Sequence, residues 1–165
     1  MNTLHPAIVH LPLGVAIVMP LLFAALTWAL WTGRLGRRGF LLGALLQAAI
    51  LAGGLVALRT GGADEERVES VVPEAAIERH EQLAQVFTGA AGVTLLLALG
   101  AALLPERAAR KLALAATVAS VGVVGLGVAV GHAGGQLVYQ HGAAAVYASP
   151  QAGAPVDARA ERDDD

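Results

Sequence analysis

Cysteine is absent from this sequence of 165 residues. Its absence excludes disulfides, cysteine-ligated zinc, iron–sulfur clusters and haem attached covalently through a C-x-x-C-H motif. Any bound metal must therefore be held by nitrogen or oxygen atoms, or by the sulfur of the two methionines, Met1 and Met19.

Charge is also scarce, since only 15% of the residues are charged and the formal net charge is -2. A chain without a basic field has little attraction for the phosphates of nucleic acid, so a nucleic-acid partner is excluded. The sequence has no Gly-rich phosphate loop, no Ser-His-Asp arrangement and no H-E-x-x-H zinc motif. Hydrolytic catalysis therefore has no support, and whether the protein is an enzyme of another kind stays open.

Apolar residues are abundant and make up 56% of the chain. They are concentrated in four runs, at residues 6–31, 40–58, 83–104 and 112–130. Each run is about the length of the roughly 20 residues that cross the hydrocarbon core of a bilayer. No Lys or Arg precedes the first run, so we expect it to be kept as a span and not removed as a secretory signal.

The fold class that follows is all-α membrane, a bundle of four transmembrane helices. We expect this transmembrane domain to cover residues 1–147. Residues 148–165 are rich in Ala, Pro, Gly and Asp and are expected to form a flexible acidic tail.

Charges between the runs predict the orientation of the chain. The short connections after the first and third runs hold six of the 11 Lys and Arg residues: Arg34, Arg37, Arg38, Arg107, Arg110 and Lys111. The connection at residues 60–82 is acidic, with seven Asp and Glu residues against two Arg. Because basic loops stay in the cytoplasm, the sequence predicts a multi-pass protein of the bacterial inner membrane with both termini outside.

Prolines and glycines mark the expected bends and ends of the helices. Pro73 is followed by acidic, helix-forming residues, so the third helix is predicted to begin there and to project above the membrane. Two prolines inside the first run predict a bend near Ile8 or Ala16. The pair Gly134-Gly135 predicts that the fourth helix ends and that the next segment folds back over the bundle.

All five histidines fall on the predicted outer side of the membrane. His5 and His10 enter the first helix, His80 enters the third, His132 leaves the fourth, and His141 follows it. Imidazole is a common metal ligand and a frequent axial ligand of haem, and ionisable groups at membrane depth are costly enough to indicate function. The competing interpretation is that interfacial histidines are simply solvated polar tips at the headgroup level.

If the chain folds back after the glycine pair, the side chains of His10, His80, His132 and His141 can meet in one pocket. These four are the candidate cofactor or metal ligands. His5 and Glu81 are candidates for supporting positions around them, because a carboxylate beside a ligating imidazole fixes its tautomer.

Glycine and glutamine residues in and next to the apolar runs indicate contacts between helices. Gly127, Gly131 and Gly135 repeat every four residues, which is typical of close helix packing but also leaves room for a flat macrocycle. Gln47 and Gln85 are expected to form hydrogen bonds between helices, with a proton or quinone path as the alternative.

The motifs HPAIVHLP at residues 5–12, HE at 80–81, GHAGG at 131–135 and YQHG at 139–142 together resemble a known family. The chain is similar, over residues 1–147, to the bacterial membrane proteins classed as domain of unknown function 2231. That family is described as four-helix membrane proteins, sometimes fused to c-type cytochrome modules, and the resemblance therefore implies an electron-transfer setting. Leu11 stands where phenylalanine is common in the family, and no cytochrome module is fused here, which implies a separate redox partner.

Three functions are consistent with these observations. The first is a membrane protein whose outer, histidine-lined pocket binds b-type haem and passes electrons. The second is a non-haem copper or zinc site at the same histidines. The third is a structural accessory subunit of a larger membrane complex, without a cofactor.

Overall fold

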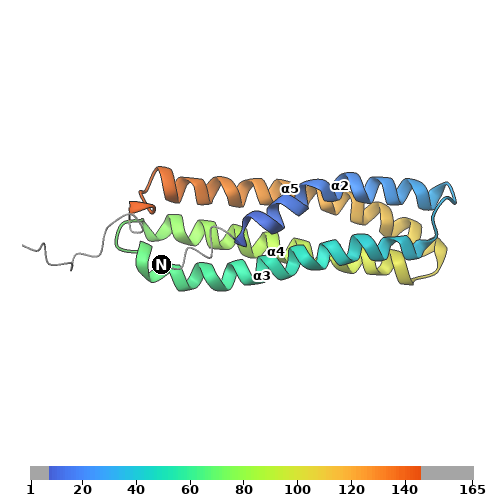
Figure 1. The fold of residues 1–165 in the computed structure, drawn as a ribbon, viewed down its shortest axis with the longest axis horizontal. Helices are drawn as coiled ribbons and strands as arrows, with labels where there is room; N and C mark the ends of the chain where they lie inside the picture. Colours follow the sequence, from blue (N-terminus) through green and yellow to red (C-terminus); the bar gives the residue numbers. More distant parts are fainter. Residues whose placement is uncertain (1–7, 146–165) are drawn as a thin grey trace, which may run out of the picture.

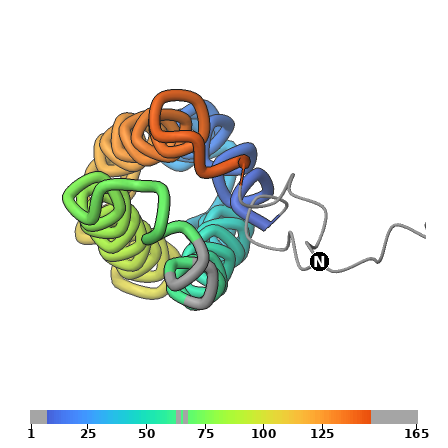
Figure 2. The backbone as a smooth tube through the Cα atoms, turned by 90° about the vertical axis from the view of Figure 1, so that its left-hand side faces the viewer, coloured from blue at the N-terminus to red at the C-terminus, as the bar shows by residue number. Residues whose placement is uncertain are grey.

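The computed structural model describes residues 8–145, apart from the side chains of residues 63, 64, 66 and 67. The helices in that part of the chain are α2 (His10–Trp31), α3 (Phe40–Val68), α4 (Glu74–Leu103), α5 (Glu106–Tyr139) and the short 3-10 helix η1 (Arg37–Gly39). Each long helix packs against the next along the chain, and α2 also packs against α5. The molecule is thus an elongated four-helix bundle (Figure 1), and Figure 2 shows the helices arranged as a ring around a common axis.

All four helices are long and apolar enough to cross a membrane. Large apolar side chains point away from the bundle, among them Leu11, Leu21, Leu45 and Leu96, each more than two-thirds exposed. The interior is instead rich in alanine, which lets helix backbones approach closely, as in other membrane bundles. The predicted fold of a multi-pass, four-helix membrane protein is confirmed.

The two ends of the bundle differ in charge. The basic end carries the connections that follow α2 and α4, and the acidic end carries the connection between α3 and α4. At the basic end, the guanidinium of Arg34 lies 4.3 Å from the ring centroid of Trp28. Arg37 Nη1 donates a 3.0 Å hydrogen bond to the carbonyl oxygen of Leu104, which closes the end of α4.

Three helices are longer than the apolar runs indicated. α3 continues to Val68, ten residues beyond the predicted end at residue 58, because Ala, Glu and Arg sustain a helix outside an apolar environment as well as inside it. α4 begins directly after Pro73, as predicted. The acidic connection is therefore mostly helical, and α3 and α4 both extend beyond their apolar parts.

The predicted break at Gly134-Gly135 is wrong. α5 runs without interruption to Tyr139, and the chain leaves the helix only at Gly142, which adopts the left-handed backbone with φ of 74°. His141 N–H and Ala143 N–H donate to the carbonyls of Gln136 and Leu137, which closes the end of the helix. Gly134 packs against His80 of α4 within the continuous helix, and the chain turns back only after Gly142, where Ala143 joins the apolar cluster at the tip of the bundle.

α2 is the short helix of the bundle. It has 22 residues and is about 33 Å long, whereas α5 has 34 residues and is about 51 Å long. Its N-terminal part runs obliquely to the rest of the helix (Figure 1), consistent with the predicted bend, since Pro20 inside the helix cannot donate to the carbonyl of Ala16. Pro12 falls in the first turn, where its missing N–H costs no helical hydrogen bond.

Polar contacts between helices are few and specific. Gln47 is fully buried and its Nε2 donates a 3.1 Å hydrogen bond to the carbonyl of Ala91, so its predicted role between helices is confirmed. Gln85 is exposed and donates instead to Glu81 Oε1, at 3.1 Å on its own helix, so the same prediction is wrong for Gln85. It faces outward from α4 because its apolar neighbours Phe87 and Ala91 take the inward face.

Candidate functional site

A cavity of about 450 Å³ lies within the acidic end of the bundle and is lined by all four helices. It exists because the helices differ in length. α3 and α5 extend past the level at which α2 begins, so the described part of the chain has no fourth helix beside their last turns.

Apolar side chains close the cavity at both of its ends. Toward the membrane interior it is bounded by Pro12, Leu13, Phe87 and the hydroxyl-bearing Thr88, of which Phe87 belongs to the main core and Leu13 packs against it. Toward the tip of the bundle it is bounded by Val68, Ile77, Leu137 and Ala143, which form a second apolar cluster with Val72. The cavity is thus an apolar chamber with few polar groups, the usual character of a ligand site.

Four side chains with a titratable carboxyl or imidazole line the chamber among the described residues: His10, Glu65, His80 and Glu81. His10 lies in the first turn of α2, and His80 and Glu81 lie in the second turn of α4. Glu65 comes from the extension of α3 that the sequence analysis read as a loop. The hydrogen bond from Gln85 holds one oxygen of Glu81, which limits the orientations of that carboxylate.

The two histidines belong to helices on opposite sides of the ring. Neighbouring helices pack in the order α2, α3, α4, α5 and back to α2, so α2 and α4 are diagonal to each other (Figure 2). His10 and His80 therefore approach the chamber from opposite sides. His10 is exposed, and His80 is partly buried.

Each of the other two helices contributes three glycines to the lining, beside larger side chains. α3 lines the chamber with Gly54, Gly61 and Gly62, and α5 lines it with Gly131, Gly134 and Gly135. A Cβ added at Gly62, Gly131 or Gly135 would meet no atom within 4 Å. These positions keep the chamber wide between α3 and α5, at right angles to the histidine pair.

Gly134 has a separate role, since it lies against the imidazole of His80. A Cβ added there would lie 3.1 Å from His80 Cε1 and 3.5 Å from His80 Nδ1, tighter than ordinary van der Waals contact at the first of these atoms. The ring of His80 is thus packed against the backbone of α5. Gly127, about two turns further into the bundle, is a packing position beside Leu13 and Phe87.

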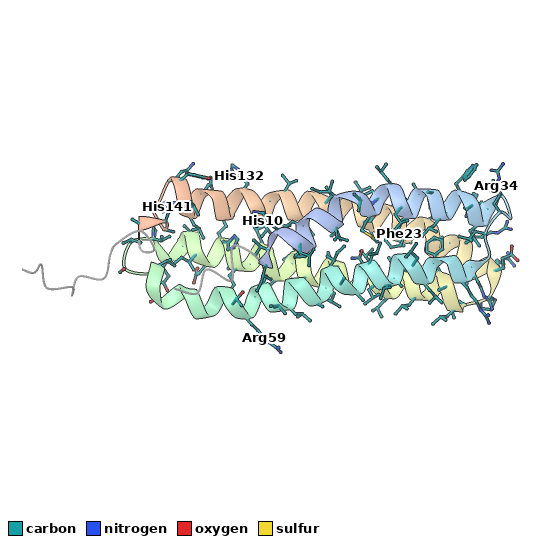
Figure 3. The ribbon with its side chains drawn as sticks, in the orientation of Figure 1. His10, Phe23, Arg34, Arg59, His132 and His141 are labelled. Carbon is teal, nitrogen blue, oxygen red and sulfur yellow. The ribbon has the colours of Figure 1, made fainter. Side chains whose placement is uncertain are left out.

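His132 and His141 do not line the chamber. Because α5 is unbroken, His132 lies on its outward face and is exposed, as Figure 3 shows. His141 lines a different hollow on the side of the bundle. The expected meeting of four imidazoles is therefore reduced to His10 and His80. His5 lies outside the described residues.

His132 fits the simpler interpretation of an interfacial polar tip. Counting about 20 residues, or 30 Å, from the basic ends of the helices brings the chain to Leu11 in α2 and to Leu126 in α5, and His132 lies six residues, or about 9 Å, beyond that point. Arg59 is exposed at the corresponding level of α3, and Figure 3 shows it on the opposite side of the bundle from His132. Both side chains are at the height of the lipid headgroups.

Sequence reasoning missed Glu65 and the three glycines of α3. A polar pattern of Ala, Asp, Glu and Arg, which favours a helix, follows residue 60. This pattern could have indicated that α3 continues beyond its apolar run.

In residues 8–145, His, Asp and Glu side chains form no group of three or more that could hold a metal ion. Comparison of the chain with protein-family models, with curated proteins and with solved structures gives no match. The functional interpretation therefore depends on the geometry of the chamber.

Proposed function

We propose that the chamber binds b-type haem, which His10 and His80 would hold, and that the protein transfers electrons. The observation that carries this proposal is the pair of imidazoles on diagonal helices that line one largely apolar chamber, with three glycines from each of the other two helices. Two histidines from different helices are sufficient to ligate a haem iron.

The residues of the chamber fit this group better than they fit a bare metal ion. Copper and zinc sites built without cysteine use three or more imidazole or carboxylate ligands, and the described residues offer no such group. A haem needs only two, together with an apolar cavity and room for its edges. The glycines of α3 and α5 supply that room.

Bound haem would supply one-electron transfer. The protein's own side chains would hold the haem and influence its reduction potential. His10 and His80 would ligate, while Glu65 and Glu81 are the carboxylates that line the same chamber and can accept a hydrogen bond from a ligating ring. The apolar closures at both ends would restrict water and so influence the reduction potential.

Haem and metal content of the purified protein test this proposal. The protein is produced in a bacterium with haem supplied, extracted in mild detergent, and analysed by absorption spectroscopy, pyridine haemochrome assay and elemental analysis. We expect a Soret band and about one haem b per chain. Colourless protein with stoichiometric copper or zinc would contradict the haem assignment. Protein without either, copurifying with a larger assembly, would favour an accessory subunit.

We further propose that the acidic end faces the outside of a bacterial inner membrane, with both termini there and a separate redox protein as partner. The six basic residues of the short connections support this orientation. The motif resemblance to domain of unknown function 2231 supports the electron-transfer setting, and we propose membership of that family.

The absence of native cysteine makes the orientation easy to test. Single cysteines are introduced as Glu69→Cys at the acidic end and Arg107→Cys at the basic end, both at exposed positions. An impermeant maleimide added to intact spheroplasts should label Glu69→Cys, and should label Arg107→Cys only after permeabilisation. The reverse pattern would place the chamber on the cytoplasmic side.

A further inference from the structure

A second hollow lies on the side of the bundle, between the first turns of α4 and the last turns of α5. Its volume is about 350 Å³, and none of its lining residues also lines the chamber. The residues that line it are Pro73, Ala75, Ala76, Arg79, Ala133, Gln136, Gln140 and His141. We call it the lateral groove.

The polar side chains of the lateral groove can all donate hydrogen bonds. Arg79 brings a guanidinium, Gln136 and Gln140 bring amides, and His141 brings an imidazole. Among the residues that the structure describes, no carboxylate lines the groove, although the acidic connection lies next to it. On an end of the molecule that is otherwise acidic, this surface is therefore suited to an anion.

The groove also lies at the height of lipid phosphates. About 20 residues of α4, or 30 Å, separate Leu103 from residue 83, which marks the edge of the hydrocarbon core. Arg79 is four residues further, or about 6 Å beyond that edge, within the headgroup layer. Since the groove opens between α4 and α5 on the flank of the bundle, a lipid in the same leaflet can reach it.

We propose that the lateral groove binds a phosphate group, as carried by the headgroup of an anionic phospholipid. The guanidinium of Arg79 would bind two phosphate oxygens, and the amides and imidazole on α5 would donate to the remaining oxygen atoms. A phosphate held in this way bridges α4 to α5 at the end of the bundle where His80 packs on Gly134. This assigns His141 to anion binding.

The test uses full-length protein in detergent and two probes. Native mass spectrometry measures retention of phosphatidylglycerol, and isothermal titration calorimetry measures binding of inorganic phosphate. Arg79→Gln and Gln136→Leu remove donors from the groove on its two sides. Arg59→Gln is the matched control, because Arg59 is also exposed at headgroup height but lies outside the groove.

We expect one phosphatidylglycerol per chain in the wild type and in Arg59→Gln, with binding at least about tenfold weaker in Arg79→Gln and in Gln136→Leu. Phosphate binding with the same dependence on Arg79, without lipid retention, would support the site with a soluble oxyanion as its ligand. Equal binding by Arg79→Gln and Arg59→Gln, or binding of neither probe, would overturn the proposal. The readouts do not involve haem, so this result is independent of the chamber.

Discussion

His80→Ala should abolish haem binding while leaving the protein folded in the membrane. Within the described part of the chain, His80 is one of two histidines that line the chamber, and its ring is held against the backbone of α5 at Gly134. Loss of a supporting residue around a metal costs about 10- to 100-fold in affinity, and loss of a ligand itself should cost at least the upper end of that range. The measurement is haem per chain after purification, together with helix content by circular dichroism.

His132→Ala is the control for this experiment. His132 is exposed on the outward face of α5 and does not line the chamber, so its removal should leave haem content unchanged. His10→Ala should behave like His80→Ala, because His10 faces the chamber from the diagonal helix. Loss of haem in His132→Ala, with retention in His80→Ala, would mean that the ligand lies elsewhere.

Gly134→Leu should displace the imidazole of His80 and reduce haem content about as strongly as removing the imidazole. The first atom of the new side chain would already lie 3.1 Å from His80 Cε1, and the branched end of leucine would overlap the ring. Leucine favours a helix more than glycine does, by about 0.8 kcal/mol or more, so loss of helix is not the expected cause. Haem content and thermal stability should be measured on the same preparation.

The matched control is Gly125→Leu, on the same helix. Gly125 is exposed, and a Cβ there would meet no atom within 4 Å, so leucine would extend into lipid. Its haem content should equal that of the wild type. If both glycine variants lose haem equally, the effect comes from α5 as a whole and the contact between Gly134 and His80 is not responsible.

Much of the fold could be predicted from the sequence, because the length of an apolar run is a strong signal of a membrane-spanning helix. Four runs of apolar residues predicted four helices, and Pro73 predicted the start of α4 correctly, since proline is favoured just before a helix and acidic residues suit its first turn. Gln47 was predicted to bond between helices because an amide in a mid-membrane segment needs a partner there.

The candidate site could be predicted only in part from the sequence, because it depends on where the helices end relative to one another. The acidic part of α3 was interpreted as a connection between helices. For this reason Glu65 and the wall of the chamber formed by α3 were not predicted. Gly134 was read as a helix breaker, whereas its missing side chain makes room for His80. The helix preference of a single residue does not tell a glycine that ends a helix from one that makes room for a neighbouring side chain. Packing against another helix decides between the two. That error carried His141 into the predicted site.

Electron paramagnetic resonance tests the central claim most directly, because it distinguishes the ligands of a haem iron. Electron paramagnetic resonance of the oxidised, purified protein should show a low-spin ferric haem with two imidazole ligands. His10→Ala and His80→Ala should each convert any residual haem to a high-spin form, and added imidazole should restore the low-spin signal. A high-spin wild type, or a low-spin signal that persists in both variants, would contradict the assignment of His10 and His80 as the pair that holds the ligand.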